Sequence, residues 1–169
     1  MTLLLIACVA VAAMLPAPSA RAEDAPGFEL PELAGSTPRS LVDLRGRFVY
    51  LDFWASWCGP CRHALPVLDN LQKELAGERF TVLAVNLDER PEDGRAFLER
   101  FPVSYPVLSD PHGRVARAFA LPGMPTSYLI DPAGRIVWRH VGFKRRDGPR
   151  IRARIIAALE AQEGNRAGP

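Results

Sequence analysis

Residues 53–61 of the chain read FWASWCGPC and place two cysteines, Cys58 and Cys61, three positions apart. The largely apolar, aromatic-rich run at residues 47–54 has the length and composition of a buried strand. Leucines that recur every three or four positions after Cys58, up to residue 76, predict a helix that starts at the cysteines. A thiol at the start of a helix faces free backbone N–H groups and the positive end of the helix dipole, which lower its pKa. We therefore expect Cys58 to be a reactive thiol and Cys61, one turn further along, to be shielded.

The first 22 residues have the pattern of an export leader. Residues 3–15 form an apolar run that is too short for a helix crossing a bilayer. A small-x-small triplet follows at residues 20–22, so we expect a secretory signal peptide cut after Ala22. An uncleaved membrane anchor is one alternative, and a lipid anchor on Cys8 is another. In each case the sequence predicts export, to the periplasm.

The remainder of the chain has the composition of a globular domain. The full chain has 169 residues, 48% of them hydrophobic and 24% charged, with a formal net charge of +2. This length fits a single domain, expected at residues 23–163, followed by a disordered tail at residues 164–169. The near-neutral net charge gives no indication of a basic surface for nucleic acid. We also expect the protein to be a monomer.

Cys58 and Cys61 are the only cysteines after the leader. A disulfide between them closes a very short ring, and the stabilisation that a disulfide gives grows with the loop it closes. A structural zinc site needs four ligands, whereas the sequence has no second CxxC pair and no paired histidines. The pair is therefore expected to serve redox chemistry, with no metal and no cofactor.

The pattern beyond the cysteines alternates strands and helices. Residues 80–87 predict a second buried strand and residues 91–100 a second helix, so the first two strands are expected to pair in parallel. The other predicted elements are a strand at 105–108, a helix at 113–120, a hairpin of strands 126–130 and 135–141, and a helix at 151–159. Residues 23–35 are expected to be irregular apart from a strand-like piece at 28–30. The predicted fold class is α/β.

Two stretches resemble the thioredoxin superfamily, and within it the exported TlpA/ResA-like thiol-disulfide oxidoreductases. They are FWASWCGPC at residues 53–61 and GMPTSYLID at residues 123–131, and the resemblance covers nearly the whole chain after the leader. It implies a thioredoxin-like central mixed sheet flanked by helices, with an N-terminal extension and an inserted strand–helix segment at residues 104–120. It also implies that Cys58 is the nucleophile and that Cys61 resolves the mixed disulfide.

The same resemblance implies a groove for protein substrates beside the cysteines. The Met124-Pro125 peptide bond is expected to be cis, an isomer that the residues alone leave open. The predicted groove residues are Trp57, Gly59, Pro60, Met124, Pro125 and Gly142. The expected partners are cysteine-containing proteins and a membrane-bound thiol electron donor.

Two related activities lack their residues here. The opening APGFELP at residues 25–31 is similar to that of peroxiredoxins, the AhpC/TSA-like proteins. Peroxiredoxins need a PxxxTxxC pattern at the reactive cysteine. Here Leu51 stands at the proline position of this pattern and Ala55 at the threonine position. Members of the family that act in cytochrome-c maturation carry a Glu three residues after the second cysteine, where this chain has Ala64.

Asp52 lies six residues before Cys58 in an otherwise apolar strand. A desolvated carboxyl group has a raised pKa and is suited to accept a proton from Cys61. The alternative is an aspartate at a strand end that faces water. Because an aspartate is rarely buried without a partner, we predict that Asp52 is a proton shuttle.

Gly59 and Pro60 match the dipeptide of thioredoxin, whose reduction potential lies near −270 mV, against about −120 mV for the oxidant DsbA. This gap is roughly 7 kcal/mol and favours a protein that reduces disulfides in periplasmic proteins. The alternatives are a disulfide-forming oxidant, a cytochrome-c maturation thioredoxin and a non-catalytic chaperone.

Overall fold

The computed structural model of the chain describes residues 23–75, 77 and 79–166. The signal peptide or anchor predicted at residues 1–22 lies outside this part. Within the described ranges, no helix combines the length and the apolar character that crossing a membrane requires.

A six-stranded mixed sheet in the order β1-β8-β7-β4-β5-β6 forms the centre of the molecule. β4 pairs in parallel with β5, and β5 with β6, whereas β4–β7, β7–β8 and β1–β8 are antiparallel. The predicted parallel pairing of the first two apolar strands is confirmed. The strands are β1 (Glu23–Asp24), β4 (Phe48–Trp54), β5 (Phe80–Asn86), β6 (Val107–Ser109), β7 (Thr126–Ile130) and β8 (Arg135–Val141).

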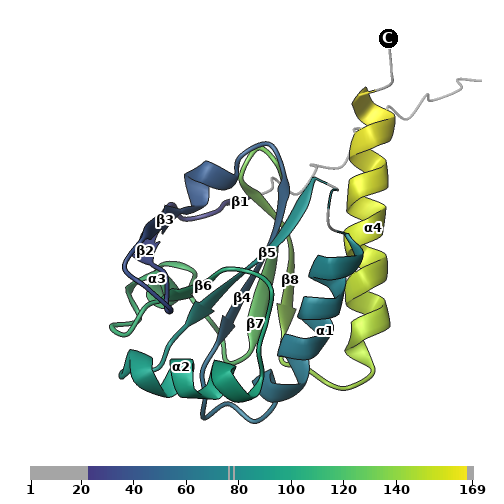
Figure 1. Ribbon diagram of the computed structural model, residues 1–169. Coiled ribbons are helices and arrows are strands. Elements are labelled where there is room, and N and C mark those ends of the chain that lie inside the picture. Colours follow the sequence, from purple (N-terminus) through teal and green to yellow (C-terminus); the bar gives the residue numbers. More distant parts are fainter. Residues whose placement is uncertain (1–22, 76, 78, 167–169) are drawn as a thin grey trace, which may run out of the picture.

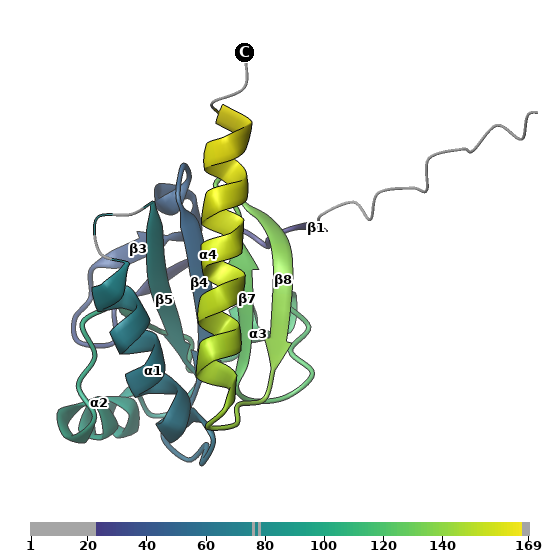
Figure 2. The ribbon, with the colours of Figure 1, turned by 90° about the vertical axis from the view of Figure 1, so that its right-hand side faces the viewer.

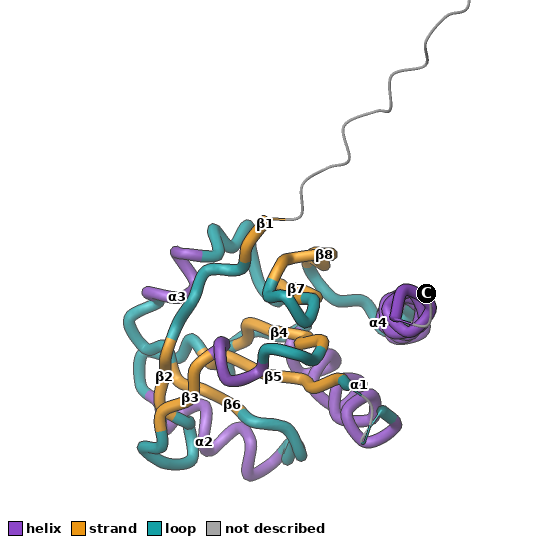
Figure 3. Tube along the Cα trace, turned by 90° about the horizontal axis from the view of Figure 1, so that it is seen from above, coloured by secondary structure: helices purple, strands orange, loops and turns teal. Residues whose placement is uncertain are grey.

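Helices flank the sheet on both faces, as expected (Figure 1). α1 (Cys61–Glu74) and α4 (Asp147–Arg166) cover one face, which Figure 2 shows from the front. The opposite face carries α3 (Arg114–Ala118) and a small sheet of β2 (Glu29–Pro31) and β3 (Pro38–Ser40), as the view from above shows (Figure 3). The other helical elements are the 3-10 helix η1 (Leu41–Leu44) and α2 (Pro91–Arg100).

The two faces of β4 belong to two hydrophobic cores, because successive side chains of a strand point in opposite directions. Tyr50 and Trp54 pack with Cys61 and the helices α1 and α4. Leu51 and Phe53 pack with the core under α3 and β2. Every residue of β4 is buried, so Asp52, between Tyr50 and Trp54 in the alternation, faces the layer that holds the cysteines.

Several predicted boundaries differ from the structure. The inserted segment at residues 104–120 does contain a strand and a helix, β6 and α3. The first helix, however, begins at Cys61 and not at Cys58, and its N-cap residue is Pro60. The last helix is longer than predicted at both ends, and its end at Arg166 includes the first three residues of the expected tail.

Candidate active site

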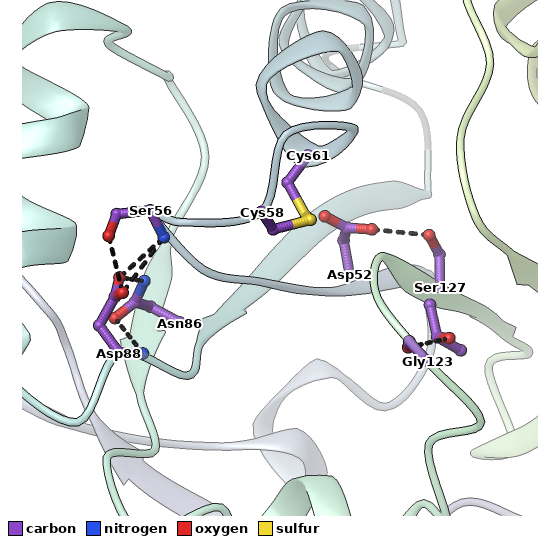
Figure 4. Close-up of a disulfide and its surroundings, with 9 residues drawn as sticks. Asp52, Ser56, Cys58, Cys61, Asn86, Asp88, Gly123 and Ser127 are labelled. Carbon is purple, nitrogen blue, oxygen red and sulfur yellow. Dashed lines mark hydrogen bonds between the residues drawn. A yellow bond between two sulfur atoms is a disulfide. The ribbon is translucent and has the colours of Figure 1, made fainter.

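Cys58 and Cys61 are joined by a disulfide at the start of α1 (Figure 4). Cys58 lies in the turn that leads from β4 into the helix, and its backbone N–H donates to the Ala55 carbonyl oxygen at 3.1 Å. Cys61 is the first residue of α1 and is fully buried, whereas 5% of Cys58 is exposed. Although Cys58 precedes the helix, the disulfide holds its sulfur at the helix start, where the first N–H groups are free.

Cys58 is therefore less accessible in the disulfide form than the sequence suggests. It is the more accessible cysteine of the two, but the protein covers most of it. Trp57, immediately before it, is exposed, with 71% of its surface accessible. Trp54, three residues earlier, is completely buried and belongs to the core.

Asp52 is buried, with 1% of its surface exposed. Its Oδ1 accepts a hydrogen bond from the Ser127 hydroxyl at 2.6 Å, while Oδ2 has no hydrogen-bond partner among the described residues. Figure 4 shows the carboxyl group between Ser127 and the disulfide, with one oxygen directed toward each. Burial raises the pKa of Asp52 from 3.8 to about 7, and the Ser127 hydrogen bond only partly offsets this effect.

A second loop approaches the cysteines from the start of β7. The Met124-Pro125 peptide bond is cis, as the resemblance implied. The Gly142 N–H donates to the Pro125 carbonyl oxygen at 2.7 Å, which ties the end of β8 to this loop. Gly142 has a φ of +76°, a left-handed conformation that glycine adopts without strain. Of the predicted groove residues in this loop, Met124 and Gly142 are half-buried and Pro125 is buried.

An open groove of about 440 Å³ lies beside Trp57 and Met124. Its other wall comes from the inserted segment, since Ala116 and Arg117 of α3 and Leu121 after it line the groove. The surface is mostly apolar. Of the residues predicted for a substrate groove, Trp57 and Met124 line it, whereas Gly59 and Pro60 are exposed on the active-site turn.

A buried polar network on the other side of the turn was not predicted. The Asp88 carboxylate accepts hydrogen bonds from the backbone N–H of Ser56, at 3.0 and 3.2 Å, and from its hydroxyl, at 2.7 Å. It also accepts from the Asn86 amide at 2.6 Å. The network fixes the turn before Cys58 to the end of β5 (Figure 4). Polar residues at the end of an apolar strand and just beyond it, Asn86 and Asp88, were the signal available in the sequence.

Comparison with known proteins places this site in a family. A model of the AhpC/TSA family matches residues 22–139. The chain belongs to the AhpC/TSA family.

Similar proteins are named as a thioredoxin-like protein and as thiol-disulfide oxidoreductases. The thioredoxin-like protein YneN of Bacillus subtilis is 37% identical over 71% of this chain and 71% of its own. The thiol-disulfide oxidoreductase ResA of the same organism is 34% identical over 68% of this chain, but the match spans only 63% of ResA.

A solved structure agrees with this assignment. The crystal structure of a DsbE-type thiol:disulfide interchange protein from Chlorobium tepidum has a TM-score of 0.78 and 43% identity, and the match covers 82% of this chain and 96% of that one. The fold is therefore thioredoxin-like. With its Cys58–Cys61 disulfide, this AhpC/TSA family member is a thiol-disulfide oxidoreductase.

Proposed function

We propose that this oxidoreductase reduces disulfides in exported proteins through the Cys58–Cys61 pair. The observation that carries the proposal is the placement of a buried carboxyl group, with its pKa raised to about 7, beside a disulfide at a helix start. Cys58 and Cys61 differ in access, and Asp52 lies beside their disulfide.

In the proposed reaction, the Cys58 thiolate attacks one sulfur of a substrate disulfide and releases the other as a thiolate. The Cys61 thiol then transfers its proton to Asp52 and attacks the Cys58 sulfur. The Cys58–Cys61 disulfide forms, and the second substrate thiolate leaves. Two electrons have passed from the dithiol to the substrate, and the two substrate thiolates take up protons from solvent or from Asp52.

A protein substrate is favoured by the surface beside the cysteines. Trp57 is exposed and forms one wall of the apolar groove that Met124 and α3 complete. Large apolar side chains exposed next to a concave surface are typical of sites that bind a polypeptide. Cys58, which follows Trp57 directly in the chain, would attack a disulfide presented by an extended segment of the substrate.

The direction of the reaction, the location and the electron supply complete the proposal. The exposed Gly59-Pro60 dipeptide is that of thioredoxin, a reductant. The export leader predicted at residues 1–22 would deliver the protein to the periplasm.

A reductant in an oxidising compartment needs a continuous supply of electrons, for which we propose a membrane-bound thiol donor. We propose that the protein works as a monomer.

The reduction potential tests the proposed direction. The full chain is equilibrated with glutathione or dithiothreitol mixtures, and tryptophan fluorescence follows the fraction oxidised, because Trp57 is next to Cys58. We expect a value at or below about −230 mV. A value near −120 mV would identify a disulfide-forming oxidant and contradict the proposal.

A trapping experiment tests the proposed substrate class. In Cys61→Ser the mixed disulfide between Cys58 and its substrate is not resolved, so it accumulates. We expect the Cys61→Ser variant to capture periplasmic proteins in adducts that dithiothreitol releases. Cys58→Ser is the matched control and is expected to capture none. Equal capture by the two variants would contradict the roles assigned to the cysteines, and a Cys58→Ser variant that keeps the protein's cellular function would indicate a binding chaperone.

A further inference from the structure

Ser127 lies directly opposite Asp52 in the sheet. The two residues are paired in the antiparallel register of β4 and β7, so their side chains emerge on the same face. Only 4% of Ser127 and 1% of Asp52 is exposed. The Ser127 hydroxyl is 2.6 Å from Oδ1 of Asp52, and it is the only hydrogen-bond donor to this carboxyl group in the described part of the chain.

We propose that Ser127 is the positioning residue of the proton shuttle: its hydroxyl holds Oδ1 of Asp52 and thereby directs the incoming proton to Oδ2, the oxygen that faces the cysteines. This inference rests on the proposed function, in which Asp52 accepts the proton of Cys61. Ser127 touches neither the sulfur atoms nor the substrate in this scheme and acts only through Asp52.

The chemistry follows from the two inequivalent oxygens. A hydroxyl that donates to Oδ1 reduces the basicity of that oxygen and stabilises the ionised carboxylate. Oδ2, which is buried and has no hydrogen-bond partner among the described residues, is then the site left for a proton. Figure 4 shows this oxygen on the disulfide side of the carboxyl group and Ser127 on the other. A proton on Oδ2 is therefore placed where Cys61 loses or regains it.

The titratable groups around Asp52 come from every element packed against it. They are Tyr50 on β4, Tyr105 in the segment before β6, His140 on β8, Asp147 at the start of α4, and the two cysteines at the start of α1. Burial raises the pKa of both tyrosines, so they stay neutral while Asp52 titrates.

His140 continues the row of polar side chains, because it is paired with Ser127 in the register of β7 and β8. Its Nε2 is 3.5 Å from Oδ2 of Asp147. Burial lowers the pKa of His140 below its usual 6.5, the carboxylate of Asp147 works against this effect, and the imidazole is neutral at the pH where Asp52 titrates. Within this environment, Ser127 is the group that hydrogen-bonds to Asp52.

Removal of the hydroxyl has a defined consequence. A hydrogen bond to an ionised group in the interior is strong enough to shift a pKa by about 1 to 2 units. In Ser127→Ala we expect Asp52 to titrate that much higher than in the unaltered protein. At pH 7 this slows any step that needs the Asp52 carboxylate about 5-fold to 50-fold.

The test follows the two thiol steps separately. The reduced full-length protein is mixed with one equivalent of 5,5′-dithiobis(2-nitrobenzoate), and the absorbance of released thionitrobenzoate is recorded. The first thionitrobenzoate leaves when Cys58 attacks the probe. The second leaves when Cys61 attacks the resulting mixed disulfide, and this phase needs the Asp52 carboxylate. The rate of the second phase is measured as a function of pH.

In Ser127→Ala, we expect the pH midpoint of the second phase to rise by about 1 to 2 units, with the first phase unchanged. Ser127→Thr, which keeps the hydroxyl, is expected to restore the original midpoint. The matched control is Ser109→Ala, since Ser109 is also a buried strand serine but its hydroxyl has no hydrogen-bond partner among the described residues. A second phase that is slower at every pH with an unshifted midpoint would reveal a merely structural role and overturn the inference.

Asp52→Asn separates the two claims. We expect it to abolish the pH midpoint near 7 in the second phase. If it does so while Ser127→Ala leaves the midpoint in place, the role of Ser127 is refuted and the proposed role of Asp52 stands. If Asp52→Asn leaves the profile intact, the proton-shuttle role fails and the inference about Ser127 fails with it.

Discussion

Replacement of Asp52 by Asn should stabilise the folded protein at neutral and alkaline pH. The carboxyl group is buried, and burial raises its pKa from 3.8 to about 7. The difference is about 3 units, and each unit corresponds to 1.36 kcal/mol, so the ionised group costs the native state about 4 kcal/mol above pH 7. An amide of the same shape carries no charge and avoids this cost.

The raised pKa of Asp52 determines in which direction its contribution to stability changes with pH. Because the native state binds the Asp52 proton more tightly than the unfolded chain, stability from this group is fully present below about pH 3.8 and is lost as the pH rises toward 7. The difference in unfolding free energy between Asp52→Asn and the unaltered protein should therefore grow by about 4 kcal/mol from pH 4 to pH 8. Other ionisable groups contribute equally to both proteins and cancel in this difference.

The assay is urea unfolding of the oxidised protein, monitored by tryptophan fluorescence at several pH values between 4 and 8. Asp110→Asn is the matched control. Asp110 is equally buried, but its carboxylate accepts hydrogen bonds from the backbone N–H groups of Arg114, Val115 and Ala116 at the start of α3. Its replacement should destabilise the protein by about 1 kcal/mol. A stability difference for Asp52→Asn that does not change with pH would refute the reasoning.

Two further predictions concern access to the cysteines and packing below the active-site turn. Iodoacetamide should label Cys58 of the reduced protein before Cys61, because Cys61 is fully buried; peptide mapping that finds Cys61 labelled first would reverse the proposed roles. Gly94→Ala should destabilise the fold by about 1 to 3 kcal/mol, measured by thermal or urea unfolding, because a Cβ there would lie 2.7 Å from Oδ1 of Asn86, which Asp88 holds in place. Gly27→Ala, with open space around it, should change stability by less than about 0.5 kcal/mol, and equal effects would refute the packing argument.

The buried elements of the fold were predictable from the sequence because burial leaves a compositional trace. The apolar strands β4 and β5 were predicted within one residue at each end, and the bounds of α2, β7 and β8 match the structure. β4 and β5 are nearly continuous apolar runs because both of their faces are covered. A strand with one face in solvent would instead alternate apolar and polar residues.

The elements that were missed have no such trace. β1 is two exposed acidic residues, and β3 is a short, mostly exposed strand. Each is a strand only because a partner lies beside it, β8 for β1 and β2 for β3. The early start predicted for α1 has a different cause: the leucine pattern marks the buried face of a helix but not the residue at which its hydrogen bonds begin.

The site was predictable to the extent that it is local in sequence. Cys58, Cys61 and the adjacent turn form one continuous motif, and Asp52 stands out as an acid in an apolar strand. Ser127 gave no signal of this kind, because a serine in a strand is unremarkable until the register places it opposite Asp52. Its contact with Asp52 depends on topology, since the two residues are 75 positions apart.

The position of Asp52 is itself an argument about function. A carboxyl group in the core with one hydrogen-bonded oxygen and one unpaired oxygen destabilises the native state, and a neutral side chain would fit the same space at lower cost. Among its neighbours only Ser127 relieves part of this cost, since Tyr50 is neutral and no cation contributes to the pKa shift of Asp52. A costly ionisable group beside a reactive disulfide is the arrangement expected where proton transfer accompanies chemistry. The instability that Asp52 introduces therefore supports the proton-shuttle role more directly than its proximity to the cysteines does.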